Sequence, residues 1–466
     1  MLWLCLRFAH LPVELGPRQI EKLAITDRIR SRRIVIAANE AARAIGICPG
    51  MEATRALLKE PELRLVERSK TDERRALHAL ADWALQFSST VHVEPTRWLV
   101  WLEIGASLRY FEGLTALRVR LERSVAALDY TATLGIAPTL EAAALFSHDP
   151  HARPVIHGDD IAPQAAPLDL SLLVLGDNIL EQLAATGLTT VGAVLEVPTD
   201  ALARRFGPET TGYLQRLLGK QPDLRRPHRA PETYRRSYEF ADPIHSVEGL
   251  LFPLRRIMRE FEGYLRGRDC AIQRVDLTLR HRDSPESSFS LHTSAPMRDA
   301  SRLFALLREK LERTPWESPA RAVIVKATEF QTPEVLQGDF FDDSQRQRAS
   351  WSALLDKLRA RLGEQAIRQL GLRDDHRPEQ AWCIQNGNSD GDVQTPQPDR
   401  PLWLLDPIPI SRPANLLGRP ERIEAGWWSG TDTRRDYYLA MSPEGGRWWL
   451  YKDVDQDQWY LQGLWA

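Results

Sequence analysis

The sequence predicts a multidomain protein that combines α/β and α+β modules and ends in a small β module rich in tryptophan. At 466 residues, the chain exceeds the ~250–300 residues at which a single hydrophobic core stops growing. Strand and helix patterns alternate up to about residue 150, give way to short helices joined by glycine turns, and alternate again from residue 234. Seven of the 14 tryptophans lie in the last 67 residues, among turn signals.

Composition places the chain among ordinary globular proteins. Hydrophobic residues make up 43% and charged residues 27%, and no apolar run approaches the ~20 residues that span a bilayer. Arg7 and His10 interrupt the apolar start, so we expect no signal peptide and a cytoplasmic location. No C-x-x-C pair occurs among the four cysteines, which are Cys5, Cys48, Cys270 and Cys383. We therefore expect reduced thiols, no zinc site and no cofactor.

Residues 1–165 predict an α/β layer. Over residues 17–64 the pattern indicates short helices around a turn at Gly46–Gly50. The elements expected after them are a longer amphipathic helix at Thr71–Phe87, strands at Thr90–Glu94, Trp98–Ile104 and Tyr130–Ile136, and helices at Ala116–Leu128 and Leu140–Ser147.

The rest of the chain divides into four further parts. Residues 166–232 predict short helices, and nine Lys or Arg against three acids make residues 201–236 locally basic although the net charge is −2. Residues 233–335 predict a module of strand, long helix, strand, helix and strand. Residues 336–400 are polar, with one helix near Ser350–Leu370 and a linker at Asn386–Asp399. Residues 401–466 predict a small β-meander.

Several stretches of the first part resemble the Y-family translesion DNA polymerases. Leu134–Thr139 (LGIAPT) and the helix that ends in AALFS resemble the block where a palm strand meets a helix. Glu40–Met51 (EAARAIGICPGM) is similar to the fingers stretch of that family, and Leu102–Ile104, Phe111–Gly113 and the opening MLWLCLRFAHLPVE are similar to others, in family order. The resemblance implies palm and fingers over residues 1–165, a helix-hairpin-helix thumb over 166–232 and a little finger over 233–335.

The resemblance also indicates which residues to inspect for catalysis. Polymerase chemistry uses two divalent cations held by carboxylates. In this chain the acidic positions of the family fall at Cys5, Arg7, Trp98 and Leu99, none of which offers a hard oxygen ligand. We therefore expect no bound metal and no polymerase activity, with Trp98 and Trp101 filling the space left by the metals.

The nucleotide pocket of the family is altered at further positions. Glu40 stands where the resemblance places a tyrosine, and Ala144 stands where it places a lysine. Arg43 keeps the place of a phosphate-binding arginine, but without its partners we interpret it as an ordinary surface arginine. The alternative is an active Y-family polymerase whose carboxylates are relocated to Glu14, Glu94 and Glu103.

A second motif predicts contact with DNA. Leu183–Gly192 reads as a helix, a turn at Gly187 and a new helix starting at Thr190 and Gly192, which resembles a helix-hairpin-helix. Such a motif binds a phosphate through backbone N–H groups without reading sequence. The alternative is an αα-hairpin that only packs. The side chains expected to bind phosphates are Arg225, Arg226, Arg235, Arg236, Arg274, Arg280 and Arg282.

A third motif predicts a contact with the sliding clamp. The segment Gln337-Gly338-Asp339-Phe340-Phe341 is similar to the pentapeptide by which bacterial proteins dock on the clamp, although Gly338 departs from the usual leucine. Adjacent aromatic residues in a polar segment are typical interface anchors. Gln369–Leu372 is a rival, but Arg373 follows it and a helix could explain its leucines. We prefer the first segment.

The tail resembles the ImuB-type proteins, a catalytically degenerate Y-family branch found in bacterial mutagenesis cassettes. The stretches that carry this resemblance are Arg400–Leu405 and Glu421–Trp428, continuing through Tyr437 and Tyr438 to Leu464. The resemblance implies a non-catalytic adaptor in the response to DNA damage. Its implied partners are damaged or primer-template DNA, the sliding clamp, a RecA-like protein encoded with it and an error-prone C-family DNA polymerase. Residues 401–466 would be the partner-binding module.

Overall fold

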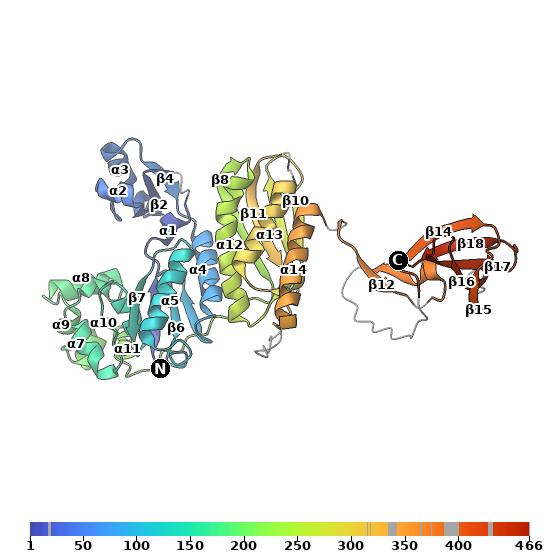
Figure 1. The fold of residues 1–466 in the computed structure, drawn as a ribbon. Coiled ribbons are helices and arrows are strands. Elements are labelled where there is room, and N and C mark those ends of the chain that lie inside the picture. The colour runs from blue at the N-terminus through green and yellow to red at the C-terminus, as the bar shows by residue number, and fades with distance from the viewer. Residues whose placement is uncertain are drawn as a thin grey trace. The chain divides into compact units, whose positions relative to one another are not determined.

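The computed structural model describes residues 1–16, 20–314, 316, 318–333, 343–363, 366–373, 375–385, 400–426 and 432–465. They form two compact units, Met1–Arg361, which combines strands and helices, and Leu362–Ala466, whose described part consists mainly of strands (Figure 1). The predicted combination of α/β and α+β parts with a β-rich end is confirmed. None of the described helices has the length and apolar character to cross a membrane.

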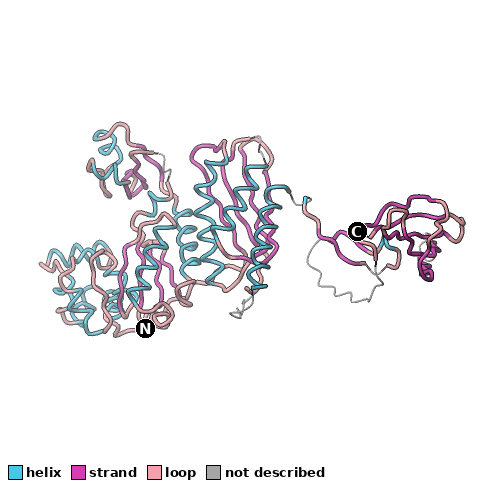
Figure 2. Tube along the Cα trace, viewed as in Figure 1, coloured by secondary structure: helices cyan, strands magenta, loops and turns pink. Residues whose placement is uncertain are grey.

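A four-stranded antiparallel sheet, which we call the palm, lies at the centre of the first unit. Its order is β5-β6-β1-β7, and its strands are β1 (Trp3–Arg7), β5 (Val91–Glu94), β6 (Leu99–Glu103) and β7 (Thr133–Ala137). Alternation along β1 sends Leu4 and Leu6 toward helices α4 (Lys70–Ala84) and α5 (Leu114–Ala127). The opposite face packs against α6 (Leu140–Phe146), so helices flank the palm strands on both sides (Figure 2).

Strands occupy much of the region where we predicted only short helices, so that prediction was wrong. After α1 (Leu11–Glu14), the fingers consist of the sheet β3-β2-β4 and two short helices. Their bounds are β2 (Leu23–Ile29), β3 (Arg32–Ala38), α2 (Glu40–Ala44), α3 (Ala53–Lys59) and β4 (Arg64–Glu67). Arg30 and Ser31 both have positive φ in the β2–β3 turn. Hairpins with this geometry favour Asn-Gly, so an Arg-Ser turn gives no recognisable signal.

The short helices predicted for the thumb are present. They are α7 (Ile161–Ala165), α8 (Asp177–Ala185), α9 (Val191–Leu195), α10 (Thr199–Phe206) and α11 (Pro208–Leu217), with 3-10 turns at Gly158–Asp160 and Leu170–Leu172. Their apolar side chains share one core with the α6 face of the palm. The thumb therefore packs directly on the face of the sheet that carries Cys5.

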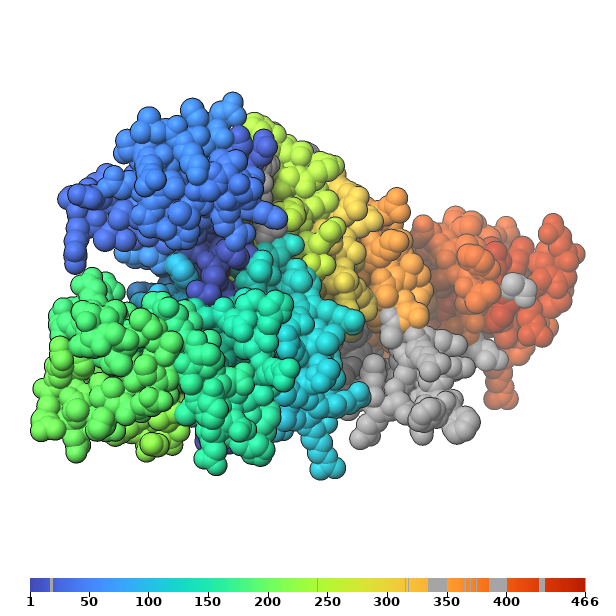
Figure 3. Space-filling model, turned by 90° about the vertical axis from the view of Figure 1, so that its left-hand side faces the viewer, coloured from blue at the N-terminus to red at the C-terminus, as the bar shows by residue number. Residues whose placement is uncertain are grey.

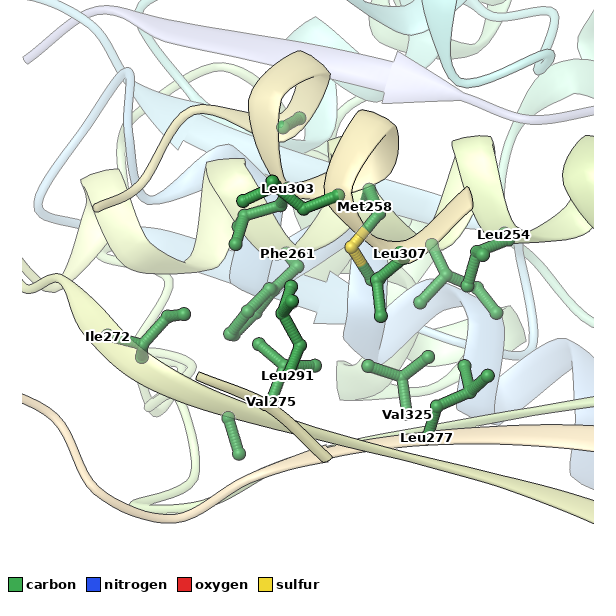
Figure 4. Packing of buried hydrophobic residues seen from close by; sticks show 14 of the residues in the cluster. Leu254, Met258, Phe261, Ile272, Val275, Leu277, Leu291, Leu303, Leu307 and Val325 are labelled. Atoms are coloured by element: carbon green, nitrogen blue, oxygen red, sulfur yellow. The ribbon is translucent and has the colours of Figure 1, made fainter. Parts of the chain in front are cut away.

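The little finger has the order β8, α12, β9, β10, α13, β11 and contains one strand, β10, more than predicted. The bounds are β8 (Tyr234–Ile244), α12 (Val247–Gly267), β9 (Ile272–His281), β10 (Ser287–Met297), α13 (Ala300–Arg313) and β11 (Ala320–Ala327). Figure 4 shows Met258 and Phe261 of α12 packed with Leu303 and Leu307 of α13 above the sheet. Helix α14 (Asp343–Leu362) is joined to this module by Asp356, which accepts the N–H of Ser294 at 2.6 Å.

A tight seam joins the little finger to the palm through α12 and α4, as Figure 1 shows. A Cβ atom on Gly263 would lie 2.4 Å from the Trp83 ring, and one on Gly267 would lie 2.7 Å from Leu85. His228 bonds Asp82 at 2.7 Å across the same region. Glycine is required at both α12 positions because any side chain would push the helices apart.

The second unit is a β structure with one short accessory ribbon. The five-stranded antiparallel sheet has the order β14-β18-β17-β16-β15, formed by β14 (Trp403–Ile410), β15 (Leu416–Ala425), β16 (Thr433–Met441), β17 (Arg447–Asp453) and β18 (Trp459–Leu464). The ribbon pairs β12 (Gln369–Leu372) with β13 (Trp382–Gln385), and the 3-10 turn Pro378–Gln380 lies between them. The leucines of Gln369–Leu372 therefore belong to a strand and not to a helix.

Tryptophans of this unit divide between core and surface. Trp449 is buried and stacks on Tyr437 with ring centroids 4.3 Å apart. Trp459 is also buried, whereas Trp403 is 62% exposed. Trp427 and Trp428 lie outside the described residues, as does the predicted linker Asn386–Asp399. The small sheet thus leaves at least one large aromatic side chain on its surface.

Candidate functional site

Three of the four inspected palm positions lie together on one face of the sheet. Cys5 pairs with Trp101 across β6 and with Gly135 across β7, and Arg7 pairs with Leu99 and Thr133. Directly paired residues share a face, and alternation along β1 puts Cys5 and Arg7 on the same side. This face is the one that the resemblance assigns to metal ions.

The thiol of Cys5 is buried in the core. Cys5 is fully buried, and its burial raises its pKa to about 12 despite a hydrogen bond with Ser147. A Cβ atom on Gly135 would lie 2.0 Å from the carbonyl oxygen of Ala143, so only glycine lets the end of α6 approach this strand. The thiol therefore stays protonated at neutral pH and supplies no negative charge to this face.

Trp98 does not fill the space next to Cys5, contrary to our expectation. Its backbone has a φ of 57°, and its indole N–H donates to Glu73 of α4 at 2.7 Å. The guanidinium of Arg68 lies 5.2 Å from its ring. This side chain lies on the opposite face of the sheet, as expected for the neighbour of Leu99. Trp101 does pack beside Cys5, fully buried, with its N–H donated to the carbonyl of Leu140 at 2.8 Å.

A buried carboxylate, Glu141 of α6, anchors two arginines beside this face. Glu141 is 4% exposed, accepts a bond from Arg97 at 3.0 Å and pairs with Arg225. Arg225 also pairs with Asp223 and lies 4.7 Å from the centre of the Trp101 ring. The acid next to the palm face is thus neutralised by arginines within the protein.

Arg43 faces the palm from the fingers. One guanidinium nitrogen lies 3.4 Å from Nε2 of His10. Burial, Arg43 and Arg7 together lower the pKa of His10. Arg43 is exposed, in agreement with our interpretation of it as a surface arginine, and it lies next to His10. Glu40, at the start of α2, is exposed, whereas Ala144 in α6 is buried.

The three carboxylates of the alternative interpretation do not converge. Glu103 pairs with Trp3 at one end of β6, whereas Glu94 pairs with Leu99 at the other. Glu14 accepts the N–H of Thr131 at 2.8 Å. Among the residues that the structure describes, no three His, Cys, Asp or Glu side chains gather into a group that could hold a metal ion.

The arginines predicted to bind DNA fall into two groups. Arg225 and Arg236 are largely buried in ion pairs, the latter with Glu260 at 2.9 Å. Arg226 and Arg235 are exposed. Arg274 and Arg280 lie on the face of β9 opposite the little-finger core, near Asp276 and Glu286, and Arg282 follows the strand. The exposed arginines are the ones available to a ligand.

The helix-hairpin-helix residues form the predicted turn. Gly187 has a φ of 87° and open space around it, and the Thr190 side chain caps α9 by accepting the N–H of Ala193 at 3.3 Å. Gly192 packs against Ala166, where a Cβ atom would lie 2.8 Å from the alanine side chain. Gly192 therefore serves the packing of the hairpin, whereas Gly187 lies at its open tip.

The structure describes only one of the two candidate clamp segments, Gln369–Leu372. Gln337, Asp339, Phe340 and Phe341 lie outside the described residues. In the rival segment, Leu370 and Leu372 pair with Ile384 and Trp382, so all four side chains share one face of the ribbon. These four side chains are 46–67% exposed. The ribbon thus carries a continuous apolar face.

Sequence reasoning missed three polar side chains beside Arg7. Thr133 is its direct partner in β7, Arg97 precedes β6, and His148 follows α6. A usable signal was present for His148, because the helix after a palm strand must run back along that strand. Nothing in the sequence marked Arg97, which depends on Glu141 for its position.

Comparisons with known proteins find similar sequences and similar solved structures. Residues 14–148 match the impB/mucB/samB family. Protein ImuB of Caulobacter vibrioides, from strains NA1000 and CB15, is 27% identical over 458 residues, which covers 90% of this chain and all of that protein. Similar solved structures include DinB from Sulfolobus solfataricus (18% identity, TM-score 0.39) and the insertion ternary complex of Dbh DNA polymerase (17% identity, TM-score 0.41), each covering 70% of this chain and 98% of the other. The chain is therefore a homologue of Protein ImuB that carries an impB/mucB/samB region across its palm and fingers.

Proposed function

We propose that this protein is a non-catalytic adaptor of a translesion DNA synthesis complex. It binds primer-template or damaged DNA through the thumb and little finger, and it binds the sliding clamp through residues 336–400. The module of residues 401–466 is the protein-partner platform. The partners of the complex are a RecA-like protein and an error-prone C-family polymerase, which performs the synthesis. The resemblance to ImuB-type proteins supports these partners, and Trp403, 62% exposed, supports a protein-binding role for the module.

One observation carries the non-catalytic assignment. The palm face holds a protonated thiol at Cys5 and a guanidinium at Arg7, where metal-dependent nucleotidyl transfer needs carboxylates. A positive side chain in that place repels divalent cations, and a thiol with a pKa of about 12 does not ligate them at neutral pH. The alternative, an active Y-family polymerase, requires carboxylates that the described part of the palm face does not gather.

Primer extension tests this assignment. We expect the purified protein to add no nucleotide to a primer-template in Mg²⁺ or Mn²⁺, because no metal pair forms to activate the primer hydroxyl. The test variant is Glu103→Ala. The matched control is Glu122→Ala, which changes an exposed residue of helix α5. Template-dependent incorporation that disappears in Glu103→Ala and persists in Glu122→Ala would establish the polymerase instead.

DNA binding should depend on salt and little on sequence. We expect the dissociation constant for a primer-template to rise steeply with salt, because phosphate contacts release counterions. Replacing the exposed Arg226 and Arg235 by Gln should reduce the slope of log K against log salt by about 2, roughly one per lost phosphate contact. Fluorescence anisotropy from low to high salt measures this slope.

The control for DNA binding is Arg308→Gln on α13, where the native arginine already pairs with Glu312 at 2.7 Å. It should leave the slope unchanged. An equal slope for the Arg226→Gln/Arg235→Gln variant and the unmodified protein would show that this part of the chain does not follow the DNA backbone.

A further inference from the structure

Arg7 is a half-buried cation without a counter-charge. Its side chain emerges from the middle of the palm face, between Leu99 and Thr133. Within the described part of the chain, no carboxylate forms an ion pair with it and no acceptor receives a hydrogen bond from it. Burial of a charged group without a partner costs free energy, so a guanidinium in this setting favours a bound anion.

Helix α6 runs back along β7, and His148, which follows this helix, therefore lies near Arg7. The end of this helix lies directly on Gly135, where a Cβ atom would meet the backbone N of Ser147 at 2.4 Å. Thr133 precedes Gly135 by two residues on the same face, so the residue after Ser147 lies toward Thr133 and Arg7. The neighbouring acid, Asp149, is exposed and accepts the N–H of His151 at 2.9 Å.

An unsatisfied hydroxyl completes the group. Oγ1 of Thr133 is buried and, among the described residues, has no hydrogen-bond partner. Thr133 is the direct cross-strand neighbour of Arg7, so this oxygen and the guanidinium face the same space. Buried polar atoms are nearly always hydrogen-bonded, and an exception calls for a ligand or another explanation.

The charges around this group are predominantly positive. Burial, Arg7 and Arg97 together lower the pKa of His148 to about 4, so its imidazole is neutral at neutral pH. Arg97 is held by Glu141, which also faces Arg225, while Cys5 is protonated and Arg43 adds a positive group from the fingers side. The electrostatic environment therefore favours an anion and disfavours a metal ion.

We propose that Arg7, His148 and the hydroxyl of Thr133 bind one phosphate group directly, without a metal ion. Arg7 supplies two parallel N–H donors, which match two phosphate oxygens. A hollow separates the fingers, in blue, from the thumb, in green (Figure 3). The inference rests on the proposed function, because it assigns a ligand to a palm that does not polymerise.

Binding measured in EDTA tests this site with two probes, dATP and a primer-template DNA. In the unmodified protein, at least one probe should bind through Arg7. Its dissociation constant should rise about tenfold in Arg7→Gln, the effect of losing a charge-assisted pair of hydrogen bonds. Thr133→Val should also weaken binding, although it removes a hydroxyl that has no partner inside the described protein and leaves the fold intact.

The pattern of losses identifies the source of the phosphate. Weaker dATP binding in both variants assigns a free nucleotide, and weaker DNA binding with no effect on dATP assigns a backbone phosphate. The matched control is Arg123→Gln on α5, which packs on the opposite face of the sheet and should change neither affinity. Unchanged affinity for both probes in Arg7→Gln and Thr133→Val would overturn the inference.

The outcomes for this site are separable from those for the proposed function. Primer extension in Mg²⁺ would refute the adaptor role whatever happens in EDTA. Unchanged binding in the two variants would refute the phosphate site and leave the adaptor role standing.

Discussion

Replacing Glu141 by alanine should destabilise the first unit by about 3–5 kcal/mol, the usual effect of removing one partner of a buried ion pair. Glu141 is 4% exposed and is shared by Arg97 and Arg225, whose side chains are each 23% exposed. Without it, two poorly solvated guanidinium groups face the core around Trp101 and no acid balances Arg97. Urea denaturation followed by tryptophan fluorescence measures the loss as a lower midpoint of the first transition.

Two comparison variants define what Glu141 contributes. Glu141→Gln keeps a hydrogen-bond acceptor but removes the charge, so it should fall between the unmodified protein and Glu141→Ala. Glu122→Ala removes an exposed acid that pairs with Arg118 four residues away on α5, and it should leave the midpoint unchanged. A midpoint in Glu141→Ala equal to that of Glu122→Ala would mean that the two arginines find other partners or water.

Clamp affinity should fall more than tenfold when Phe340 and Phe341 are both replaced by alanine. Truncation of a buried aromatic anchor typically costs ~2 kcal/mol or more at an interface. The measurement is surface plasmon resonance of the full chain on immobilised sliding clamp. The proposal depends on the sequence pattern of Gln337–Phe341, with Gln337 and Asp339 framing the two anchors.

The exposed ribbon supplies the comparison for the clamp experiment. Leu370→Ser with Leu372→Ser breaks the apolar face shared with Trp382 and Ile384 and leaves Gln337–Phe341 intact. This variant should bind the clamp as the unmodified protein does. If it loses binding and the double phenylalanine variant keeps it, the clamp segment is Gln369–Leu372.

Local periodicity made much of the fold predictable. A short apolar run predicted a strand at Trp98–Ile104, where β6 is found, and the helical spacing of Leu77, Leu80 and Trp83 predicted α4. The β2–β3 hairpin was not predicted because its turn, Arg30-Ser31, lacks the residues that usually mark a hairpin. Turn chemistry, more than hydrophobicity, decided where the prediction of the fold failed.

From the sequence, we could predict which residues of one strand share a face, but not which residues of other elements lie beside them. Cys5 and Arg7 share a face by alternation alone, so the loss of carboxylates there was evident from the sequence. The residues around Arg7 come from distant parts of the sequence. Thr133 belongs to β7, and His148 follows α6, whose end packs on Gly135. Trp98 was misplaced although alternation was sufficient to place it, because Leu99 lies on the Cys5 face and its neighbour Trp98 therefore points to the opposite one.

The glycine seam between α12 and α4 has a consequence for the proposed binding of DNA. With Gly263 against the Trp83 ring and Gly267 against Leu85, the little finger cannot swing away from the palm without opening a close-packed contact and the bond between His228 and Asp82. The orientation of these two parts is then fixed during folding and not at the encounter with DNA. Such preorganisation removes an ordering penalty from association, so a moderate number of phosphate contacts gives a tighter complex than the same contacts on a hinged molecule.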